Sequence, residues 1–171
     1  AVPANLASVL YNKTEGKISA AAINTLGVLY IVENGNTVNS LEDLKGKTVY
    51  STGNGTTPEH ALNHLLTSNG IDPQKDLTIE YKAESTEVAA VLASTPDAIG
   101  VLPEPFVTVA KSKNENLRDA ISFGDEWKKI NGEELVTGVL IVRNEFLENN
   151  QGAFETFLSE YKASTEFTKS D

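Results

Sequence analysis

Residues 51–60, STGNGTTPEH, place hydroxyl side chains and two glycines where an apolar stretch gives way to a helix-forming one. Thr57, Pro58 and Glu59 predict a helix start, with a hydroxyl cap, a proline at the first helical position and an acid near the positive end of the dipole. The first N–H groups of a helix have no intrahelical acceptor, so this loop can cradle a small polar or anionic group. The alternative is a plain turn in which Thr57 only caps its helix.

Two glycine patterns resemble phosphate-binding loops but fail their requirements. Residues 46–48, Gly-Lys-Thr, imitate the end of a P-loop, yet Leu41 stands where the first glycine is needed and the pattern precedes a strand. Gly53 and Gly55 do follow a strand, but Pro58 occupies the third glycine position of a dinucleotide fingerprint. These patterns therefore do not predict a nucleotide site.

The two histidines, His60 and His64, are four residues apart and share one helix face, a spacing that can chelate zinc. The metalloprotease arrangement needs an acid between them, and Glu59 precedes them instead. No G-x-S-x-G stretch supports a hydrolase serine. We therefore expect no metal, no cofactor and no catalytic residue.

A second unusual stretch is LPEPF, residues 102–106, in which two prolines hold a turn after an apolar strand. Open α/β sheets bind ligands at the carboxyl ends of their strands. Glu104 could face a ligand amine or hydroxyl, or it could be a helix-start acid favoured by the dipole. Trp127, beside two acids, could wall a site, although the area of a large aromatic favours a hydrophobic anchor.

The elements that must position these residues alternate between strands and helices, which predicts an α/β fold with a parallel sheet covered on its faces. Period-2 and β-branched runs predict strands, and apolar spacing of three and four predicts helices. The expected strands are 18–23, 26–32, 47–52, 77–81, 98–102 and 136–142. The expected helices are 5–12, a turn at 40–44 capped by Asn39 or Ser40, 57–68, 86–93, 106–111 and a C-terminal helix bearing Phe154, Phe157, Leu158 and Tyr161.

Composition restricts the function class further. The 171 residues carry 14 Lys and Arg against 24 Asp and Glu, a formal charge of −10. Nucleic acid needs clustered positive charge, so we expect no nucleic-acid partner. No apolar run approaches the length of a membrane span, and the chain has no Cys for disulfides or thiolate sites. It also has no Met, so we expect that Ala1 is not the translation start.

Several segments together resemble one family, the solute-binding proteins of ABC transporters in the NMT1-like group for nitrate, sulfonate, taurine and thiamine precursors. The matching segments are VPANLA (2–7), SLEDLKGKTVYSTGNGTTPE (40–59), NGIDP (69–73), LPEPF (102–106) and TGVLIVRNEFLENN (137–150). The resemblance implies a periplasmic-binding-protein fold of type 2. Such a fold has two α/β lobes joined by two crossing strands, and a solute closes the lobes by a hinge motion.

The resemblance also implies a division of the chain. Residues 1–32 would be part of lobe one and the first crossing strand, 33–135 lobe two, and 136–171 the return strand and C-terminal helix of lobe one. Members of the family are about twice this length, so lobe one would lack its opening strand, helix and strand. A lobe without them would expose an unpaired sheet edge and apolar helix faces, which favours self-association.

The resemblance implies a ligand site between the lobes and no enzyme activity. Its expected residues are Pro3, Ala4, Asn5, Thr25, Ser51, Thr52, Gly53, Asn54, Gly55, Thr56, Thr57, Glu104, Pro105 and Thr137. The expected partners are a small polar or anionic organic solute and an ABC permease, with the chain outside the cytoplasm as a lipoprotein or free in a periplasm. The alternatives are an enzyme of thiamine-type vitamin metabolism and the effector-binding domain of a regulator on the same fold.

Overall fold

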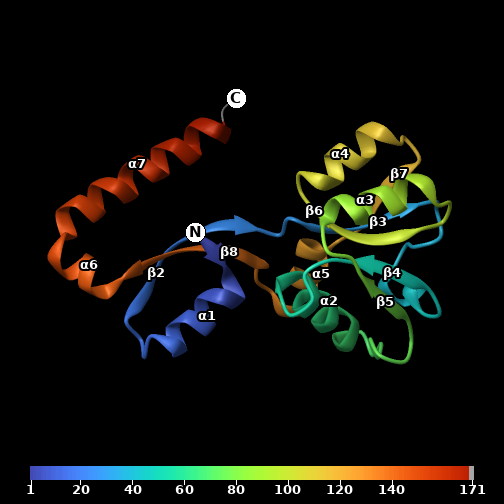
Figure 1. Ribbon diagram of the computed structural model, residues 1–171, viewed down its shortest axis with the longest axis horizontal. Coiled ribbons are helices and arrows are strands. Elements are labelled where there is room, and N and C mark those ends of the chain that lie inside the picture. The colour runs from blue at the N-terminus through green and yellow to red at the C-terminus, as the bar shows by residue number, and fades with distance from the viewer. Residues whose placement is uncertain (170–171) are drawn as a thin grey trace.

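The structure, a computed structural model that describes residues 1–169, contains two β-sheets with helices packed against them (Figure 1). The strands are β1 (Val2–Pro3), β2 (Ile18–Leu26), β3 (Leu29–Asn34), β4 (Thr48–Ser51), β5 (Thr78–Tyr81), β6 (Ile99–Pro103), β7 (Leu117–Ser122) and β8 (Val136–Arg143). The helices are α1 (Ala4–Lys13), the 3-10 helix η1 (Leu41–Leu44), α2 (Thr57–Ser68), α3 (Ser85–Ser94), α4 (Phe106–Lys113), α5 (Phe123–Asn131), α6 (Asn144–Asn149) and α7 (Gln151–Lys169).

The two sheets differ in size and in strand direction. The smaller sheet has the order β1-β8-β2 and is antiparallel throughout. The larger sheet has the order β5-β4-β6-β3-β7, in which β4 is parallel to β5 and β6 while β3 is antiparallel to both of its neighbours. The expectation of a parallel sheet is therefore wrong for β3, because the chain enters this sheet from the other one and runs against the βαβ strands.

The chain passes between the sheets at two places that lie side by side. It leaves β2 and enters β3 through Gly27 and Val28, and it returns from α5 to β8 through 132–135. The Gly27 amide donates to the Leu135 carbonyl at 2.9 Å, which ties one passage to the other. The predicted strand 26–32 is thus interrupted at residues 27–28, and 136–142 lies wholly within the smaller sheet.

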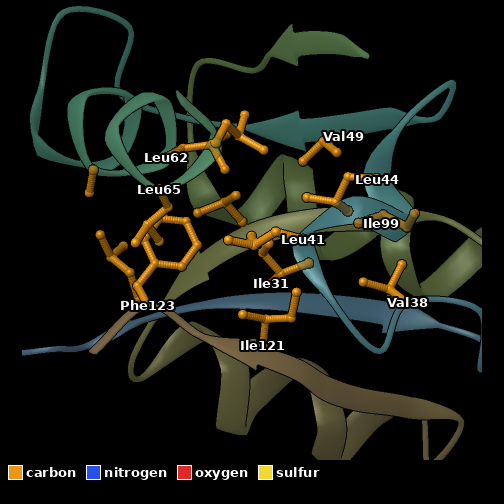
Figure 2. Packing of buried hydrophobic residues seen from close by; sticks show 14 of the residues in the cluster. Ile31, Val38, Leu41, Leu44, Val49, Leu62, Leu65, Ile99, Ile121 and Phe123 are labelled. Atoms are coloured by element: carbon orange, nitrogen blue, oxygen red, sulfur yellow. The ribbon is translucent and has the colours of Figure 1, made fainter. Parts of the chain in front are cut away.

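The main hydrophobic core lies on one face of the larger sheet, between the strands, α2 and η1 (Figure 2). The apolar stripe predicted for α2 is confirmed, since Ala61, Leu62, Leu65 and Leu66 are all buried. Phe123, the first residue of α5, is fully buried in the same cluster. A second cluster on the other face joins α3 and α4 to the sheet. Helix α2, which follows the 51–57 loop, is therefore anchored on a rigid base.

Strand β7 and helix α5 were missed by the sequence prediction. Strand β7 is an edge strand whose buried residues are Leu117 and Ile121, with the charged pair Arg118 and Asp119 between them. Alternation over six residues is a weak signal when one long polar side chain turns inward. At the C-terminus, the predicted helix is α7, and the short helix α6 that precedes it was also missed.

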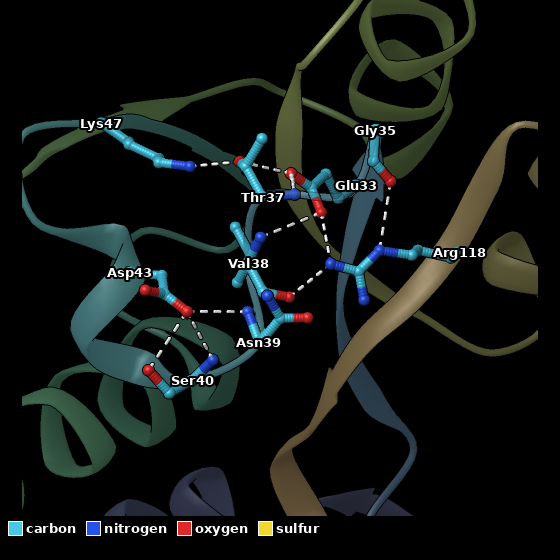
Figure 3. A network of polar contacts seen from close by, with 9 residues as sticks. All are labelled: Glu33, Gly35, Thr37, Val38, Asn39, Ser40, Asp43, Lys47 and Arg118. Carbon is cyan, nitrogen blue, oxygen red and sulfur yellow. Dashed lines mark hydrogen bonds and ion pairs between the residues drawn. The ribbon is translucent and has the colours of Figure 1, made fainter.

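Arg118 turns inward to pair with Glu33, a carboxylate with no exposed surface on β3 (Figure 3). Arg118 Nη2 donates to Glu33 Oε2 at 2.7 Å, and its Nε donates to the Gly35 carbonyl at 3.1 Å. The Thr37 amide and hydroxyl donate to Glu33 Oε1 at 2.7 and 2.6 Å. The pair fastens the β3–η1 connection to β7. The connection then leads into η1, where Ser40 and Asp43 form a capping box, so Ser40 is the cap of the two residues that the sequence allowed.

We expect the stability of the fold to fall in acid through Glu33. Burial works to raise the pKa of Glu33, but hydrogen bonds from Thr37, Val38 and Arg118 outweigh burial and lower it. A carboxyl whose pKa is lower in the folded state stabilises the fold above its unfolded pKa, roughly 4.3, and this contribution disappears as pH falls through the folded pKa.

Urea unfolding between pH 7 and pH 3 measures this effect. Glu33→Gln should reduce the loss of stability below about pH 4.5, because the variant has no proton to take up at this site. Glu148→Gln, at an exposed carboxyl of α6, is the matched control and should keep the wild-type profile. Identical pH profiles for wild type and Glu33→Gln would contradict the assignment.

The smaller sheet leaves apolar surface uncovered in the described part of the chain. Strand β2 has β8 on one side and no strand on the other, and Ile23 and Leu26 are 59% and 49% exposed. Helix α7 buries none of its described residues, although Phe154, Phe157 and Tyr161 stack along it. The expected open edge and exposed apolar helix face are thus confirmed.

Self-association of this chain stays a prediction. The nine residues of β2 include no charged residue and no proline, the usual protections of an edge strand. In analytical ultracentrifugation we expect species larger than the 18.4 kDa monomer, with a fraction that rises with protein concentration. Ile23→Lys places a charge at the exposed edge and should restore the monomer. A monomeric wild type at high concentration would refute the prediction.

Candidate functional site

The loop after β4 and the turn after β6 lie at the same edge of the larger sheet. Because β4 and β6 are parallel neighbours, with Val49 opposite Ile99, their carboxyl ends meet at one edge. Strand β3 begins at that edge, where Leu29 is opposite Pro103. The Glu104 amide donates to the Val28 carbonyl at 2.9 Å, so the passage between the sheets reaches the same place. The fold therefore brings both predicted stretches to the junction of the two sheets.

Glycine sets the shape of the 51–57 loop. Gly53 and Gly55 have φ angles of +72° and +76°, a conformation that disfavours other residues. The Thr56 amide and hydroxyl both donate to the Gly53 carbonyl and close the turn. Thr56 is the residue that precedes the first turn of α2, and Thr57 is already helical. The prediction that Thr57 caps the helix is therefore wrong by one residue, and the Thr57 hydroxyl is available for another partner.

Glu59 holds the loop from inside the first turn of α2. Its carboxylate accepts a hydrogen bond from the Gly55 amide. The same carboxylate contacts Tyr81 at the end of β5, where burial and the neighbouring Glu59 raise the pKa of the tyrosine to about 12. Tyr81 therefore stays protonated and able to donate throughout the neutral range. One acid thus links the loop, its helix and the next strand.

Two hydroxyl-bearing residues at the base of the loop are buried. Ser51 has no exposed surface and donates to the Thr52 carbonyl at 3.3 Å. Thr52 is 9% exposed, and its hydroxyl makes no hydrogen bond within the described residues. The fully buried side-chain atom without a hydrogen-bond partner in residues 1–169 is Asn63 Oδ1, so the Thr52 oxygen, which also has no such bond, still reaches solvent. The Thr52 hydroxyl can therefore offer a hydrogen bond to a bound group. Asn54 and Gly55, farther along the loop, are exposed.

From the other sheet, α1 reaches this region through its first turn. The Thr57 hydroxyl donates to Asn5 Oδ1 at 2.9 Å, across 52 residues of sequence. Beside this bond lies a hollow of about 280 Å³. The hollow is lined by Ala4, Asn5, Thr57, His60, Ala61, Trp127, Glu134, Leu135 and Val136. The structure thus brings Ala4, Asn5 and Thr57 together, as the resemblance implied, and adds lining residues from α2, α5 and the return passage.

The Glu104 carboxylate is hydrogen-bonded to the helix that follows it. Its carboxylate accepts hydrogen bonds from the Thr108 amide at 3.2 Å and from the Thr108 hydroxyl at 2.9 Å, in the first turn of α4. This is the helix-start role that was left open as the alternative. Pro105, joined to Glu104 by a cis peptide bond, is exposed beside it. Both residues lie at the edge of the larger sheet where β4 and β6 end, but the Glu104 oxygens already have hydrogen-bond partners.

The remaining predicted residues lie in the smaller sheet. Pro3 ends β1 opposite Gly138, and Thr25 in β2 is opposite the same glycine on the other side. The Thr137 hydroxyl donates to the Thr25 carbonyl at 3.3 Å. These residues support the strands near the passages, and their participation in a site stays a prediction.

The two histidines have different surroundings. The His64 ring packs on Trp127 with ring centroids 4.6 Å apart, and its Nε2 lies 3.2 Å from Asn131 Oδ1. Trp127 packs against the main core, which confirms the prediction of a hydrophobic anchor. His60 is exposed and lines the hollow beside Thr57, a role that sequence reasoning missed. Its place one helical turn after Thr57 was the available signal. Residues 1–169 contain no cluster of three or more metal-ligating side chains.

Several solved structures with a similar arrangement are described as ABC transporter proteins or as their ligand-binding components. The chain matches an ABC transporter protein of Parabacteroides distasonis with TM-score 0.72 and 24% identity, over 99% of this chain and 56% of that one. It matches the periplasmic aliphatic sulphonate-binding protein SsuA of Escherichia coli with TM-score 0.75 and 14% identity, over 95% and 53%. A protein of Methylobacillus flagellatus described as a putative periplasmic sulfonate-binding protein matches with TM-score 0.70 and 23% identity, over 95% and 47%. The fold is therefore that of type 2 periplasmic binding proteins.

The chain belongs to the NMT1/THI5-like family, whose pattern matches residues 18–171. It spans about half the length of the solved structures that it matches. A search of curated proteins found no significant match. Among the described helices, none combines the length and the apolar character that a membrane span needs.

Proposed function

We propose that this chain is part of the substrate-binding component of an ABC import system and captures a small polar or anionic organic solute between its two lobes. In this proposal the lobes divide as the sequence suggested, with residues 33–135 forming lobe two. The solute lies between the 51–57 loop and the start of α1. The protein acts outside the cytoplasm, tethered by a lipid or free in a periplasm, and passes its solute to a membrane permease.

The observation that carries the proposal is the hydroxyl of Thr52, which makes no hydrogen bond within residues 1–169 and lies in the loop that leads from β4 into α2. Thr52 follows β4 at the sheet edge where both passages between the sheets arrive. Its loop leads to the first N–H groups of α2, which favour a negatively polarised atom. Family membership and the folds of the matching structures point to the same class of protein. No lysine or arginine lies within 51–57, so in this proposal the loop holds its ligand by hydroxyl and backbone groups.

A solute screen by calorimetry tests the proposal. The panel contains an alkyl sulfonate, taurine, nitrate and an aminopyrimidine of the thiamine-precursor type. We expect at least one to bind, and Thr52→Val to weaken that binding by about tenfold because one hydrogen bond is lost without a change of shape. Thr67→Val, at the far end of α2, is the matched control. Retention of full affinity by Thr52→Val would remove this loop from the site.

A second candidate is an enzyme of vitamin metabolism, which the imidazole of His60 in the interlobe hollow favours. Mass spectrometry after incubation with the aminopyrimidine distinguishes the two functions. A receptor returns the solute unchanged. A modified product that disappears with His60→Gln would establish the enzyme instead.

A further inference from the structure

We propose that Asn5 and Thr57 form a latch that ties the two lobes to each other, so that their side chains set the closure of the cleft and are not themselves solute ligands. This proposal rests on the two-lobe receptor function proposed above and assigns the regulation of its cleft. The latch is the 2.9 Å hydrogen bond from the Thr57 hydroxyl to Asn5 Oδ1.

The bond joins the two parts of the molecule directly. Asn5 is the second residue of α1, which packs on β1, β2 and β8, all of the smaller sheet. Thr57 is the first residue of α2, which is anchored in the core of the larger sheet. The chain connects these two parts only through the adjacent passages at 27–28 and 132–135. The bond lies beside the return passage, since Leu135 and Val136 line the same hollow, and it adds a side-chain tie between the two parts. A change in the angle between the parts must break this tie.

The electrostatics of the contact explain why a side-chain oxygen is needed there. The N-termini of α1 and α2 face each other, and both are positive ends of helix dipoles, which repel. The amide oxygen of Asn5 carries a partial negative charge at this meeting point, and it accepts the hydrogen bond from the Thr57 hydroxyl. Thr57 has no other side-chain partner in the described chain, whereas the neighbouring Thr56 hydroxyl is engaged within its own loop.

The experiment measures the angle between α1 and α2 without any solute. The chain has no cysteine, so Asn12→Cys and Ser68→Cys place two spin labels at exposed sites near the far ends of the helices. Pulsed electron resonance then gives the distance distribution between them. Singly labelled protein, diluted with unlabelled chain, identifies any signal from self-association.

Wild type should show a population at the distance of the present structure. Thr57→Val and Asn5→Ala should each lower the ratio of closed to open molecules by about fivefold, the equivalent of one net hydrogen bond. The double variant should show no further change, because either substitution alone removes the same bond. Thr57→Ser keeps the hydroxyl and should restore the wild-type distribution. Thr78→Val, at an exposed position of β5 in the larger sheet, is the matched control.

An unchanged distribution in Thr57→Val, or an equal shift in Thr78→Val, would overturn the latch. These outcomes do not depend on solute binding. If the solute screen fails while Thr57→Val still opens the protein, the latch stands and the receptor function does not. If solutes bind but the distribution is unaffected, the receptor function stands and the latch does not.

Discussion

Arg118→Met is expected to destabilise the fold by about 3 kcal/mol, the largest effect that we predict for a partly exposed side chain. The substitution keeps an unbranched apolar stem but leaves Glu33 buried without its cation. It also removes donors from the Gly35 and Val38 carbonyls. Glu33 would keep the neutral donors of Thr37 and Val38, but a buried carboxylate that loses its cation is costly because less of its desolvation is offset. Urea unfolding at pH 7 measures the change.

Lys111→Met is the matched control for that measurement. Lys111 also pairs with a carboxylate, Asp119 at 2.7 Å, but both side chains are more than a third exposed. An exposed pair contributes about 0–1 kcal/mol, so the control should lose little stability. Equal losses for the two variants would show that burial of Glu33 has no special role.

Gly53→Ala is expected to destabilise the protein by about 2–3 kcal/mol and to disorder the 51–57 loop. A β-carbon at residue 53 would lie 2.2 Å from Thr56 Oγ1 and 3.3 Å from Pro58 Cγ. To relieve this crowding, Thr56 must rotate and give up its hydrogen bond to the Gly53 carbonyl. The positive φ angle adds about 1 kcal/mol of backbone strain.

Gly55→Ala separates backbone strain from crowding. Gly55 has nearly the same φ angle, but a β-carbon there would meet no atom within 4 Å. We therefore expect Gly55→Ala to cost about 1 kcal/mol, the strain alone. Chemical denaturation gives the stabilities, and calorimetry with any solute from the screen gives the effect on binding. A Gly53→Ala variant no less stable than Gly55→Ala would show that the loop tolerates the crowded position.

The local features of the site could be predicted from sequence. The glycines, the hydroxyls and Pro58 in STGNGTTPEH specify a turn that leads from a buried strand into a helix, and the structure contains that turn with the helix starting at Thr57. The buried stripe of α2 follows from apolar spacing in the same way. Each of these features depends on residues close together in the chain, so the apolar periodicity and the backbone preferences of those residues predict it.

Only the tertiary structure decided which distant groups meet. Asn5 reaches Thr57 across 52 residues, and Arg118 reaches Glu33 across 85. Strand β3 runs against β6 because the chain enters the larger sheet from the smaller one. Strand order and the path between sheets fix these contacts, and neither is encoded in the spacing of neighbouring residues.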